Sequence, residues 1–404
     1  MRLGDICDFI NGGAWSDKEY VSSGLPVLKV SNCKTKGFQI EDINYLPLSS
    51  KEKYAKNKLR LGDVIIATVG SHPNLVESAA GRSCVVTEFV DSFYLNQNAV
   101  CLRTKDNDIL NQTYLGYLCR ERIFVNYIQN KGRGAANQMR IAIGAIKDFE
   151  FDLPDIEVQI QIAKILSAYD KLIENNQKQI KLLEEAAQRL YKEWFVDLRF
   201  PGYEDVEIVD DIPNGWRNAQ LGDVIDINKE NISKNYSYDH IDYIDISSVR
   251  TGEILNTNFY ALADAPGRAK RCIHDGDVIW GMVRPNLKSY ALIMNPTNTM
   301  IASTGFAVLT PKNIPFTFLY CIVTQEAFVG YLINCTNGAA YPAVKPIHFQ
   351  QSPVLIPTDE LLNQFHLITE PLFRKIDTLH MQVNILTEAR DRLLPKLMNG
   401  LIEI

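Results

Sequence analysis

The sequence lacks the features that mark membrane proteins, secreted proteins and metalloproteins. It has no run of 18 or more apolar residues and no signal peptide, so we expect no membrane partner. Its eight cysteines are scattered without a C-x-x-C pair, which favours buried free thiols and a cytoplasmic location. The six histidines show no ligand spacing either, so we expect no metal site in this chain.

Catalytic signatures are also missing. There is no G-x-x-x-x-G-K-[ST] loop for ATP, and no G-x-G-x-x-G follows a predicted strand. NPTN at 295–298 begins like the Asn-Pro motif of amino-methyltransferases but lacks its second proline and its aromatic residue. PDIEVQ at 154–159 begins like a nuclease carboxylate motif, yet Gln159 replaces the lysine, and the acidic residues suit the positive end of a helix. We therefore expect a chain that is not an enzyme and carries no cofactor.

What the sequence does contain is two stretches with the period of a packed helix. LLEEAAQRLYKEWF at 182–195 resembles ILTEARDRLLPKLM at 385–398, and one offset of 203 aligns the apolar positions around both. These positions recur in steps of four and three, the heptad spacing of a helix that packs against another helix, and only Thr369 breaks the pattern. The predicted seam consists of Ile162, Leu166, Tyr169, Ile173, Ile180, Leu183, Leu190 and Trp194, with Phe365, Leu372, Ile376, Leu379, Val383, Leu386, Leu393 and Leu397. A pair of long core helices without special function is the alternative, and the duplicated register argues against it.

Both helices have recognisable ends. A proline and a side-chain acceptor stand at 154–155 and at 357–359, where a helix begins, and FPG at 200–202 and NG at 399–400 end it. Each predicted helix spans about 40 residues, or roughly 60 Å at 1.5 Å per residue.

The similarity between the two halves extends through the residues before each helix. Five further matches occur in the same order: LGDI at 3–6 with LGDV at 221–224, VLKVS at 27–31 with YIDIS at 243–247, GDVI at 62–65 with GDVI at 276–279, NAV at 98–100 with FAV at 306–308, and GAA at 134–136 with GAA at 338–340. The offset falls from 218 to 203 along the chain, so the elements are kept while the loops differ in length. This pattern indicates a duplicated domain, because solenoid repeats are only about 20 to 50 residues long.

The fold class that we predict is α/β. Short β-branched runs at 64–69 and 278–283 follow Gly-Asp turns and predict strands, while the stretches at 114–130 and 318–334 are more helical. The predicted organisation is two similar mixed α/β domains, each followed by a long helix. Its parts are a first globe (1–153), a first long helix (154–200), an acidic linker (201–215), a second globe (216–356) and a second long helix (357–404).

The net charge of −6 hides clusters of basic residues in both globes. The linker holds five acidic residues and no basic one, so the globes themselves are close to neutral. Glycines beside basic residues let the backbone approach a phosphate, and side-chain amides can pair with adenine. An isolated cluster is as readily a solvated loop, but four clusters at related places in two copies favour double-stranded DNA as the partner. The predicted DNA-binding residues are Lys51, Lys53, Lys56, Lys58, Arg60, Asn74, Lys131, Arg133, Gln138 and Arg140, with Arg268, Lys270, Arg271, Arg284, Asn286, Lys288 and Asn337.

Four segments resemble the specificity (S) subunit of Type I restriction-modification systems. They are LPDIEVQIQIAKIL at 153–166, LLEEAAQRLYKEWFVDLRFPGYE at 182–204, PNGWRNAQLGDV at 213–224 and LLPKLMNG at 393–400. The resemblance covers essentially the whole chain. It implies that each globe is a target recognition domain for one half of a split DNA sequence, and that the long helices pair antiparallel as a spacer.

The same resemblance implies partners for a non-catalytic chain. Two methyltransferase (M) subunits would use S-adenosylmethionine to methylate adenine in each half-site, and two ATP-driven restriction (R) subunits would join them. Tyr191, Lys192, Phe195 and Leu394 are then candidate docking positions, with packing of Phe195 on its own globe as the alternative. Two other functions stay open: an S-like reader for a methyltransferase without a nuclease, and a coiled-coil adaptor with no role on DNA.

Overall fold

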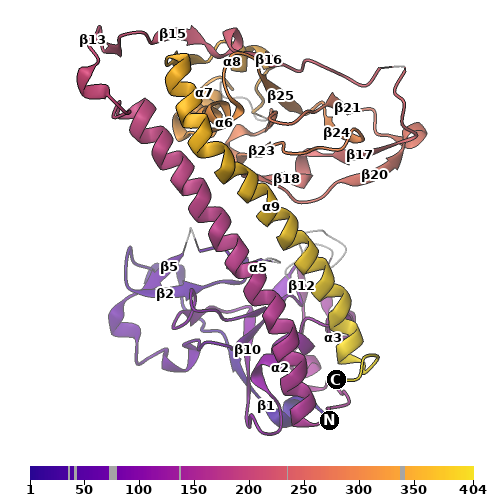
Figure 1. Ribbon diagram of the computed structural model, residues 1–404. Coiled ribbons are helices and arrows are strands. Elements are labelled where there is room, and N and C mark those ends of the chain that lie inside the picture. Colours follow the sequence, from indigo (N-terminus) through magenta and orange to yellow (C-terminus); the bar gives the residue numbers. More distant parts are fainter. Residues whose placement is uncertain (35–36, 41–42, 72–79, 136–137, 234, 337–341) are drawn as a thin grey trace. The chain divides into compact units, whose positions relative to one another are not determined.

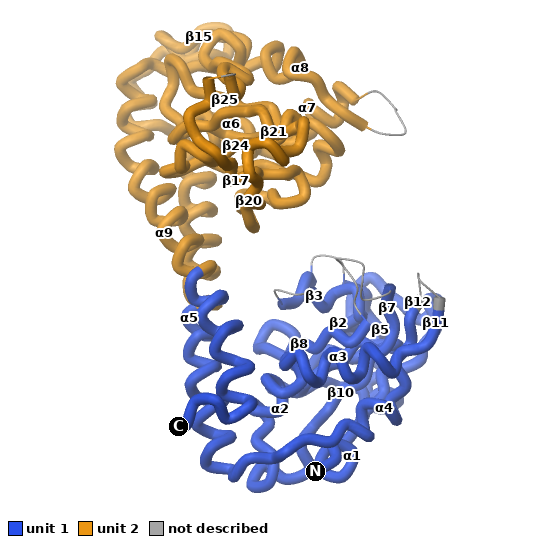
Figure 2. Tube along the Cα trace, turned by 90° about the vertical axis from the view of Figure 1, so that its right-hand side faces the viewer, with its two compact units in different colours: residues 1–172, 385–404 blue, residues 173–384 orange. Residues whose placement is uncertain are grey.

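The computed structural model describes residues 1–404 except 35–36, 41–42, 72–79, 136–137, 234 and 337–341 (Figure 1). The chain divides into two compact units (Figure 2). Unit 1 consists of Met1–Leu172 and Ile385–Ile404, and unit 2 consists of Ile173–Asn384. Each unit therefore contains one globe together with segments from both long helices.

The core of the first globe is a four-stranded antiparallel sheet that is buried on both faces. Its strands lie in the order β1 (Cys7–Asn11), β10 (Ala99–Thr104), β6 (Val64–Ala67) and β8 (Ser83–Val85). Val64 and Ile66 point into one core and Ile65 into another, which is why β6 reads as a continuous apolar run. Two smaller sheets have the orders β5 (Asn44–Leu46), β2 (Leu25–Leu28), β9 (Tyr94–Leu95), and β11 (Arg133–Ala135), β12 (Gln138–Arg140), β7 (Val69–Gly70).

The second globe repeats this arrangement. Its main sheet has the order β16 (Ile225–Ile227), β25 (Phe306–Pro311), β22 (Val278–Gly281) and β23 (Tyr290–Leu292). The second sheet has the order β20 (Asn258–Ala261), β17 (His240–Ile244), β24 (Met300–Ser303) and β21 (Ala269–Cys272). Trp280 of β22 is fully buried and donates its indole N–H to the carbonyl of Val323 at 3.0 Å, which fixes the helices behind this sheet.

The strand registers of the two globes agree residue by residue. Val64 pairs with Leu102 between β6 and β10, and Val278 pairs with Leu309 between β22 and β25. In both globes one pair is parallel within otherwise antiparallel sheets, β2 with β9 and β17 with β24. The duplication predicted from the sequence is therefore present in the backbone. The predicted match of 134–136 with 338–340 lies partly outside the described residues.

One predicted match between the copies is wrong by one residue. The sequence comparison aligned Ala99 with Ala307, but Ala99 pairs with Ala67, and the residue that pairs with the equivalent Gly281 is Phe306. The shift in numbering at this strand is therefore 207 and not 208. The difference matters because a slip of one residue turns every side chain of a strand to the opposite face.

Each predicted helical stretch after the sheet forms two helices instead of one. They are α2 (Gln112–Leu118) and α3 (Arg122–Asn130) in the first globe, and α6 (Phe316–Val323) and α7 (Glu326–Asn334) in the second. In the first globe the break occurs at Glu121, whose extended backbone ends the helical path and whose carboxylate caps α3 by accepting from the Ile123 amide. No single helix among the described residues is long and apolar enough to cross a membrane. Together α6 and α7 meet those criteria, but they bend by 60° at their break.

The two long helices are α5 (Ile156–Tyr191), of 36 residues, and α9 (Asp359–Met398), of 40 residues. At 1.5 Å per residue they extend about 54 and about 60 Å. α5 continues into a π-helical turn at Lys192–Val196, and a left-handed Gly202 follows soon after. Thr358 caps the start of α9, because its hydroxyl accepts from the Leu361 amide at 3.4 Å.

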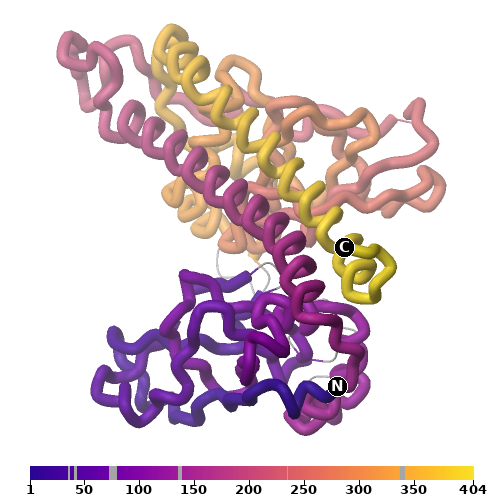
Figure 3. Tube along the Cα trace, turned by 60° about the horizontal axis from the view of Figure 1, so that its bottom comes forward, coloured from indigo at the N-terminus to yellow at the C-terminus, as the bar shows by residue number. Residues whose placement is uncertain are grey.

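Within unit 1, the start of α5 lies antiparallel to the end of α9 (Figure 3). Ile162 and Leu397 belong to the same apolar core. Asp170 of α5 accepts from Arg390 of α9 at 2.6 Å and from the Tyr117 hydroxyl of α2 at 2.7 Å. Burial raises the pKa of Asp170, but Arg120 and these hydrogen bonds outweigh it and leave that pKa below its ordinary value. This charge network ties the globe to both helices.

Within unit 2, the end of α5 lies antiparallel to the start of α9. Asn176 occupies a seam position and donates its amide N–H to Gln382 Oε1 at 3.1 Å. Further along, the rings of Trp194 and Phe365 lie 5.9 Å apart. This contact favours the pairing in which the two residues meet, because sliding the helices would leave the buried amide of Asn176 without its partner.

Every predicted seam residue is either buried or half-buried. The buried ones are Ile162, Leu166, Ile173, Ile180, Trp194, Phe365, Ile376, Leu379, Val383 and Leu397. The half-buried ones are Tyr169, Leu183, Leu190, Leu372, Leu386 and Leu393. Thr369 is fully buried despite its hydroxyl, which donates to the Phe365 carbonyl at 2.7 Å, so the polar exception in the pattern is satisfied inside its own helix.

Candidate nucleic-acid interface

The first basic cluster lies in the connection between β5 and β6. Its members Lys51, Lys53, Lys56, Lys58 and Arg60 are all exposed. Lys53 pairs with Glu19 at 3.1 Å, whereas the other four side chains have no ion-pair partner among the described residues. Four uncompensated cations on one connection form a surface that attracts an anion.

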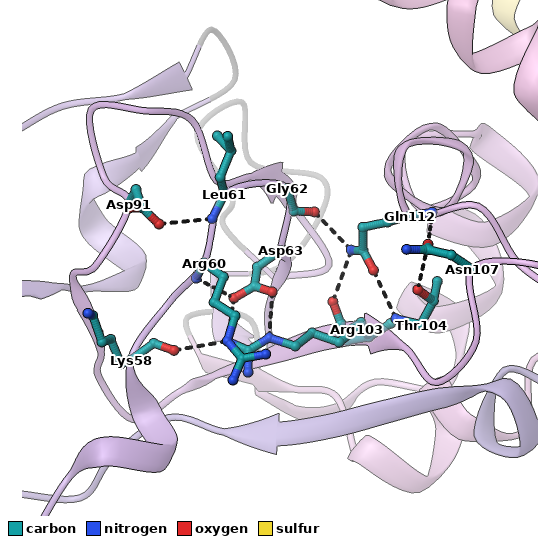
Figure 4. Close-up of polar contacts among 11 residues, drawn as sticks. Lys58, Arg60, Leu61, Gly62, Asp63, Asp91, Arg103, Thr104, Asn107 and Gln112 are labelled. Atoms are coloured by element: carbon teal, nitrogen blue, oxygen red, sulfur yellow. Dashed lines mark hydrogen bonds and ion pairs between the residues drawn. The ribbon is translucent and has the colours of Figure 1, made fainter. Parts of the chain in front are cut away.

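A network of hydrogen bonds at the following Gly-Asp turn holds this cluster in place (Figure 4). Asp63 accepts from the Arg60 amide at 2.7 Å and forms two further bonds with Arg103, at 2.6 and 2.7 Å. Arg103 also donates to the Lys58 carbonyl at 2.9 Å, and its bonds to Asp63 raise the pKa of its guanidinium. The basic connection is therefore fastened to β10 at its end.

The second basic cluster lies on the β11–β12 hairpin. Arg133 and Arg140 stand directly opposite each other across the two strands, and both are exposed. Like charges at such a position repel, and neither arginine has an ion-pair partner among the residues that the structure describes. An anion between the two guanidinium groups would relieve that repulsion. The side chain of Gln138 and the whole of Asn74 lie outside the described residues.

The third cluster, at 267–271, occupies the place in the second globe that the first cluster occupies in the first. Lys270 stands at the position of Lys56, both exposed. Arg271 is half-buried and donates to Asn231 at 2.9 Å, while its buried Nε has no partner among the described atoms. Burial lowers the pKa of Arg271. Lys270 is therefore better placed than Arg271 to contact a ligand.

The fourth cluster, at 283–288, follows the strand end that corresponds to β7. Arg284 and Lys288 both adopt left-handed backbone conformations around a short 3-10 turn, and Arg284 and Asn286 are exposed. Lys288 pairs with Glu326 of α7 at 2.5 Å, so its charge is compensated. Val283 forms a β-bridge with Ala343, just as Val69 of β7 pairs with Arg140 in the first globe. The fourth cluster therefore lies at the same edge of its globe as the second cluster. Asn337 lies outside the described residues.

A cavity of about 460 Å³ opens beside the third cluster, bordered by the paired strands β17 and β20 and by the segment at 266–268. Its polar lining includes Tyr243, Asp245, Ser247, Asn258, Tyr260 and Arg268. Of these only Arg268 was predicted. Asp245 was missed, although the repeat held a signal for it: the match of VLKVS with YIDIS replaces Lys29 by an aspartate, a reversal of charge at one position of two related strands.

The prediction that Tyr191 and Phe195 are exposed docking positions is wrong. Both are buried within unit 2, and the Phe195 ring lies 4.9 Å from Phe318 of α6 and 5.0 Å from Phe365 of α9. Phe195 thus packs on its own unit, as the alternative held. Lys192 is exposed and Leu394 half-buried, and both stay candidates.

The two stretches that resembled catalytic motifs have structural roles. Gln159 is fully buried at the start of α5, where it donates to the Ile109 and Pro154 carbonyls and accepts from the Asn111 amide. The side-chain amide of Asn295 donates to Asp377 of α9 at 3.2 Å, and its backbone N–H donates to Asp275 at 2.7 Å. These contacts give the polar residues of both segments a structural role.

A solved structure and several named proteins resemble this chain over different shares of its length. The crystal structure of a Type-I restriction-modification system S subunit from M. genitalium superposes with a TM-score of 0.62, at 16% identity, over 98% of this chain and 95% of that one. The Type I restriction enzyme MjaIX specificity subunit of Methanocaldococcus jannaschii is 27% identical over 305 residues, which are 72% of this chain and 69% of that protein. The HindI specificity subunit of Haemophilus influenzae is 28% identical over 178 residues, 42% of this chain and 37% of that protein.

The family match is duplicated, as the fold is. The Type I restriction modification DNA specificity domain matches residues 1–185 and again residues 213–379. Since these two matches cover most of the chain, the protein belongs to the family of Type I restriction-modification specificity subunits, which are not the catalytic members of their systems.

Proposed function

We propose that this chain reads a split DNA target, with one half-site bound by each globe. The observation that carries the proposal is the recurrence of exposed basic residues at equivalent places in two globes of the same register, Lys56 and Lys270 above all. Two related readers joined in one chain suit duplex DNA, because each can meet its half-site in the same way.

The long helices act as the spacer in this proposal. Their seam is continuous in the sequence, and the Asn176–Gln382 and Asp170–Arg390 contacts each fix the facing of the helices within one unit. Helices of about 54 to 60 Å can separate two readers by a turn of DNA, about 34 to 36 Å. The length of the unread gap would then follow from the helices.

The chemistry belongs to partners. We propose that two methyltransferase subunits bind S-adenosylmethionine and methylate an adenine in each half-site, and that two ATP-driven restriction subunits join them. Leu172 and Ile385, both more than half exposed within unit 1, replace Tyr191 and Phe195 as candidate docking positions beside Lys192 and Leu394. A methyltransferase served without a nuclease is the second candidate, and a neighbouring gene with helicase motifs would favour the full system.

The decisive experiment is modification-sensitive sequencing of DNA from cells that carry this chain with its adjacent methyltransferase gene, compared with cells that lack this chain. A split adenine-methylated motif that disappears with the chain is the expected result. If no motif appears, co-purification with the methyltransferase separates an inactive complex from a wrong proposal. A coiled-coil adaptor would neither yield a motif nor retain DNA in a salt-dependent way.

An exchange of domains assigns the halves of the motif. Replacing residues 216–356 by the matching domain of a relative is expected to change one half of the motif and leave the other as it was. Changes in both halves would contradict the assignment of one half-site to each globe.

A further inference from the structure

The cavity bordered by β17, β20 and the segment at 266–268 presents one hydrogen-bond acceptor whose capacity is not filled. Asp245 caps a 3-10 helix (Ile246–Ser248), where its Oδ1 accepts from the Ser247 amide at 3.1 Å and from the Ser247 hydroxyl at 3.0 Å. Its Oδ2 accepts from the Tyr243 hydroxyl at 3.1 Å. A carboxylate offers about four acceptor positions, so one position remains for a donor inside the cavity.

The opposite wall supplies donors. Arg268 is exposed and has no ion-pair partner among the described residues, and its backbone is fixed because its carbonyl accepts from the Thr304 amide at 2.8 Å. Gly267 precedes it, and no atom lies within 4 Å of the place where a Cβ would stand. Arg268 therefore lines the cavity with an exposed side chain on a backbone that is held in place.

Resting on the proposed function, the geometry points to Asp245 and Arg268 as the pair that reads a G·C base pair in the second half-site. Arginine donates two hydrogen bonds to guanine O6 and N7, and aspartate accepts from the amino group of cytosine. The cavity thus combines the donor and the acceptor that one G·C pair requires.

A phosphate fits this cavity less well than a base edge does. Burial raises the pKa of Asp245, but the hydrogen bonds from Ser247 and Tyr243 and the positive charge of Arg268 outweigh it and leave the pKa below its ordinary value, so the carboxylate is charged at neutral pH. A fixed negative charge repels a phosphate, whereas it strengthens a hydrogen bond from a base amino group. Lys270, just outside the cavity, is the better phosphate contact.

The first globe has different groups at the same two positions. Lys29 stands at the position of Asp245, and its ammonium lies 4.8 Å from the centre of the Tyr20 ring. The offset of 214 that aligns the two Gly-Asp turns sets Tyr54 against Arg268, and Tyr54 is buried and donates its hydroxyl to Glu19 at 3.0 Å. The donor and acceptor pair is therefore particular to the second globe, and the two half-sites are read differently at this place.

The test uses the complex of this chain with its methyltransferase subunits. The wild-type motif is expected to contain a fixed G·C pair in the half that changes when residues 216–356 are exchanged. Arg268→Ala is expected to relax that pair and no other position. In binding assays, replacing the pair by A·T should cost the wild type about 10- to 100-fold in affinity and cost the variant much less.

Two matched variants separate base reading from general effects. Lys270→Ala, on the neighbouring exposed position, is expected to weaken binding to all sequences evenly and to leave the motif unchanged. Asp245→Asn keeps an oxygen for the Ser247 amide but adds donors, and it is expected to weaken the preference for cytosine over thymine at that pair, because an amide N–H can donate to thymine O4.

The outcomes distinguish failure of this inference from failure of the proposed function. If the wild type yields no methylated motif and does not co-purify with the methyltransferase, the proposed function itself fails. If the wild type yields a split motif whose second half has no fixed G·C pair, or if Arg268→Ala leaves that pair fixed, the assignment of Asp245 and Arg268 is overturned while the function stands.

Discussion

The ion pair between Asp63 and Arg103 allows the stability of the first globe to be tested apart from DNA binding. Both side chains are largely buried, with 3% of Asp63 and 17% of Arg103 exposed, and they share two short hydrogen bonds. Removing one partner of a buried pair costs about 3 to 5 kcal/mol, because the other charge is left without compensation. For Arg103→Met we expect the lower end, about 3 kcal/mol, since Asp63 keeps its bond from the Arg60 amide.

The assay follows the first globe on its own. Hydrogen exchange of peptides from β6 and β10, measured by mass spectrometry across a urea series, should show the midpoint of unfolding fall by about 1.5 M at a slope of about 2 kcal/mol per molar. Adding Asp63→Asn to Arg103→Met should recover a large part of this loss, because the uncompensated charge is then gone.

A matched control exists in the second globe. Asp277 stands at the position of Asp63, but Thr310 stands at the position of Arg103, and burial raises the pKa of Asp277. Asp277→Asn should therefore leave the second globe as stable as before or more so at neutral pH. A loss below about 1 kcal/mol for Arg103→Met, the range of exposed pairs, would show that solvent screens this pair and that burial was misjudged.

Three further results are expected. Lys56→Glu or Arg133→Glu should weaken DNA binding by the complex and make its salt dependence shallower, by about 0.9 in the log–log slope for each phosphate that is no longer neutralised. Lys171→Glu on α5 should do neither. If all three variants bind DNA with equal affinity, Lys56 and Arg133 do not belong to the interface. Burial and the charge of Glu253 raise the pKa of Glu184 to about 7, so unit 2 should lose stability as the pH rises from 4.5 to about 7 and lose no more above it. In Glu184→Gln the urea midpoint should no longer fall across that range, and an unaltered slope would assign it to another group. Finally, one extra turn in both long helices should widen the gap of the methylated motif while both half-sites stay the same; an altered half-site would mean that the helices also shape base reading.

Some elements could be predicted because the sequence pattern is local and strict. The heptad steps selected residues that are all buried or half-buried, down to Leu397, since a period of 3.5 is visible without knowing the partner helix. The strand match at Ala99 failed for the opposite reason. Residues Ala99–Leu102 of its strand are buried on both faces and all apolar, so no alternation fixes the register there.

The candidate site divides in the same way. Clusters of lysine and arginine are visible in the sequence, but only coordinates show that Lys53 and Lys288 are compensated by Glu19 and Glu326. Phe195 was a candidate docking position because of the family resemblance, and it is covered by α6, which is more than a hundred residues away in the chain. Contacts of that kind follow from the tertiary fold and leave no trace in the spacing of residues.

The composition of unit 1 has a consequence for synthesis of the protein. Its apolar core contains Ile162 from the first half of the chain and Leu397 from the last turns of α9. A ribosome that has completed the first globe has therefore not completed its core, which waits for residues made after the entire second globe. A chain cut short before residue 385 would expose Ile162 and Leu166 to chaperones and proteases. Early termination would thus destabilise the first globe, although no residue of that globe is missing.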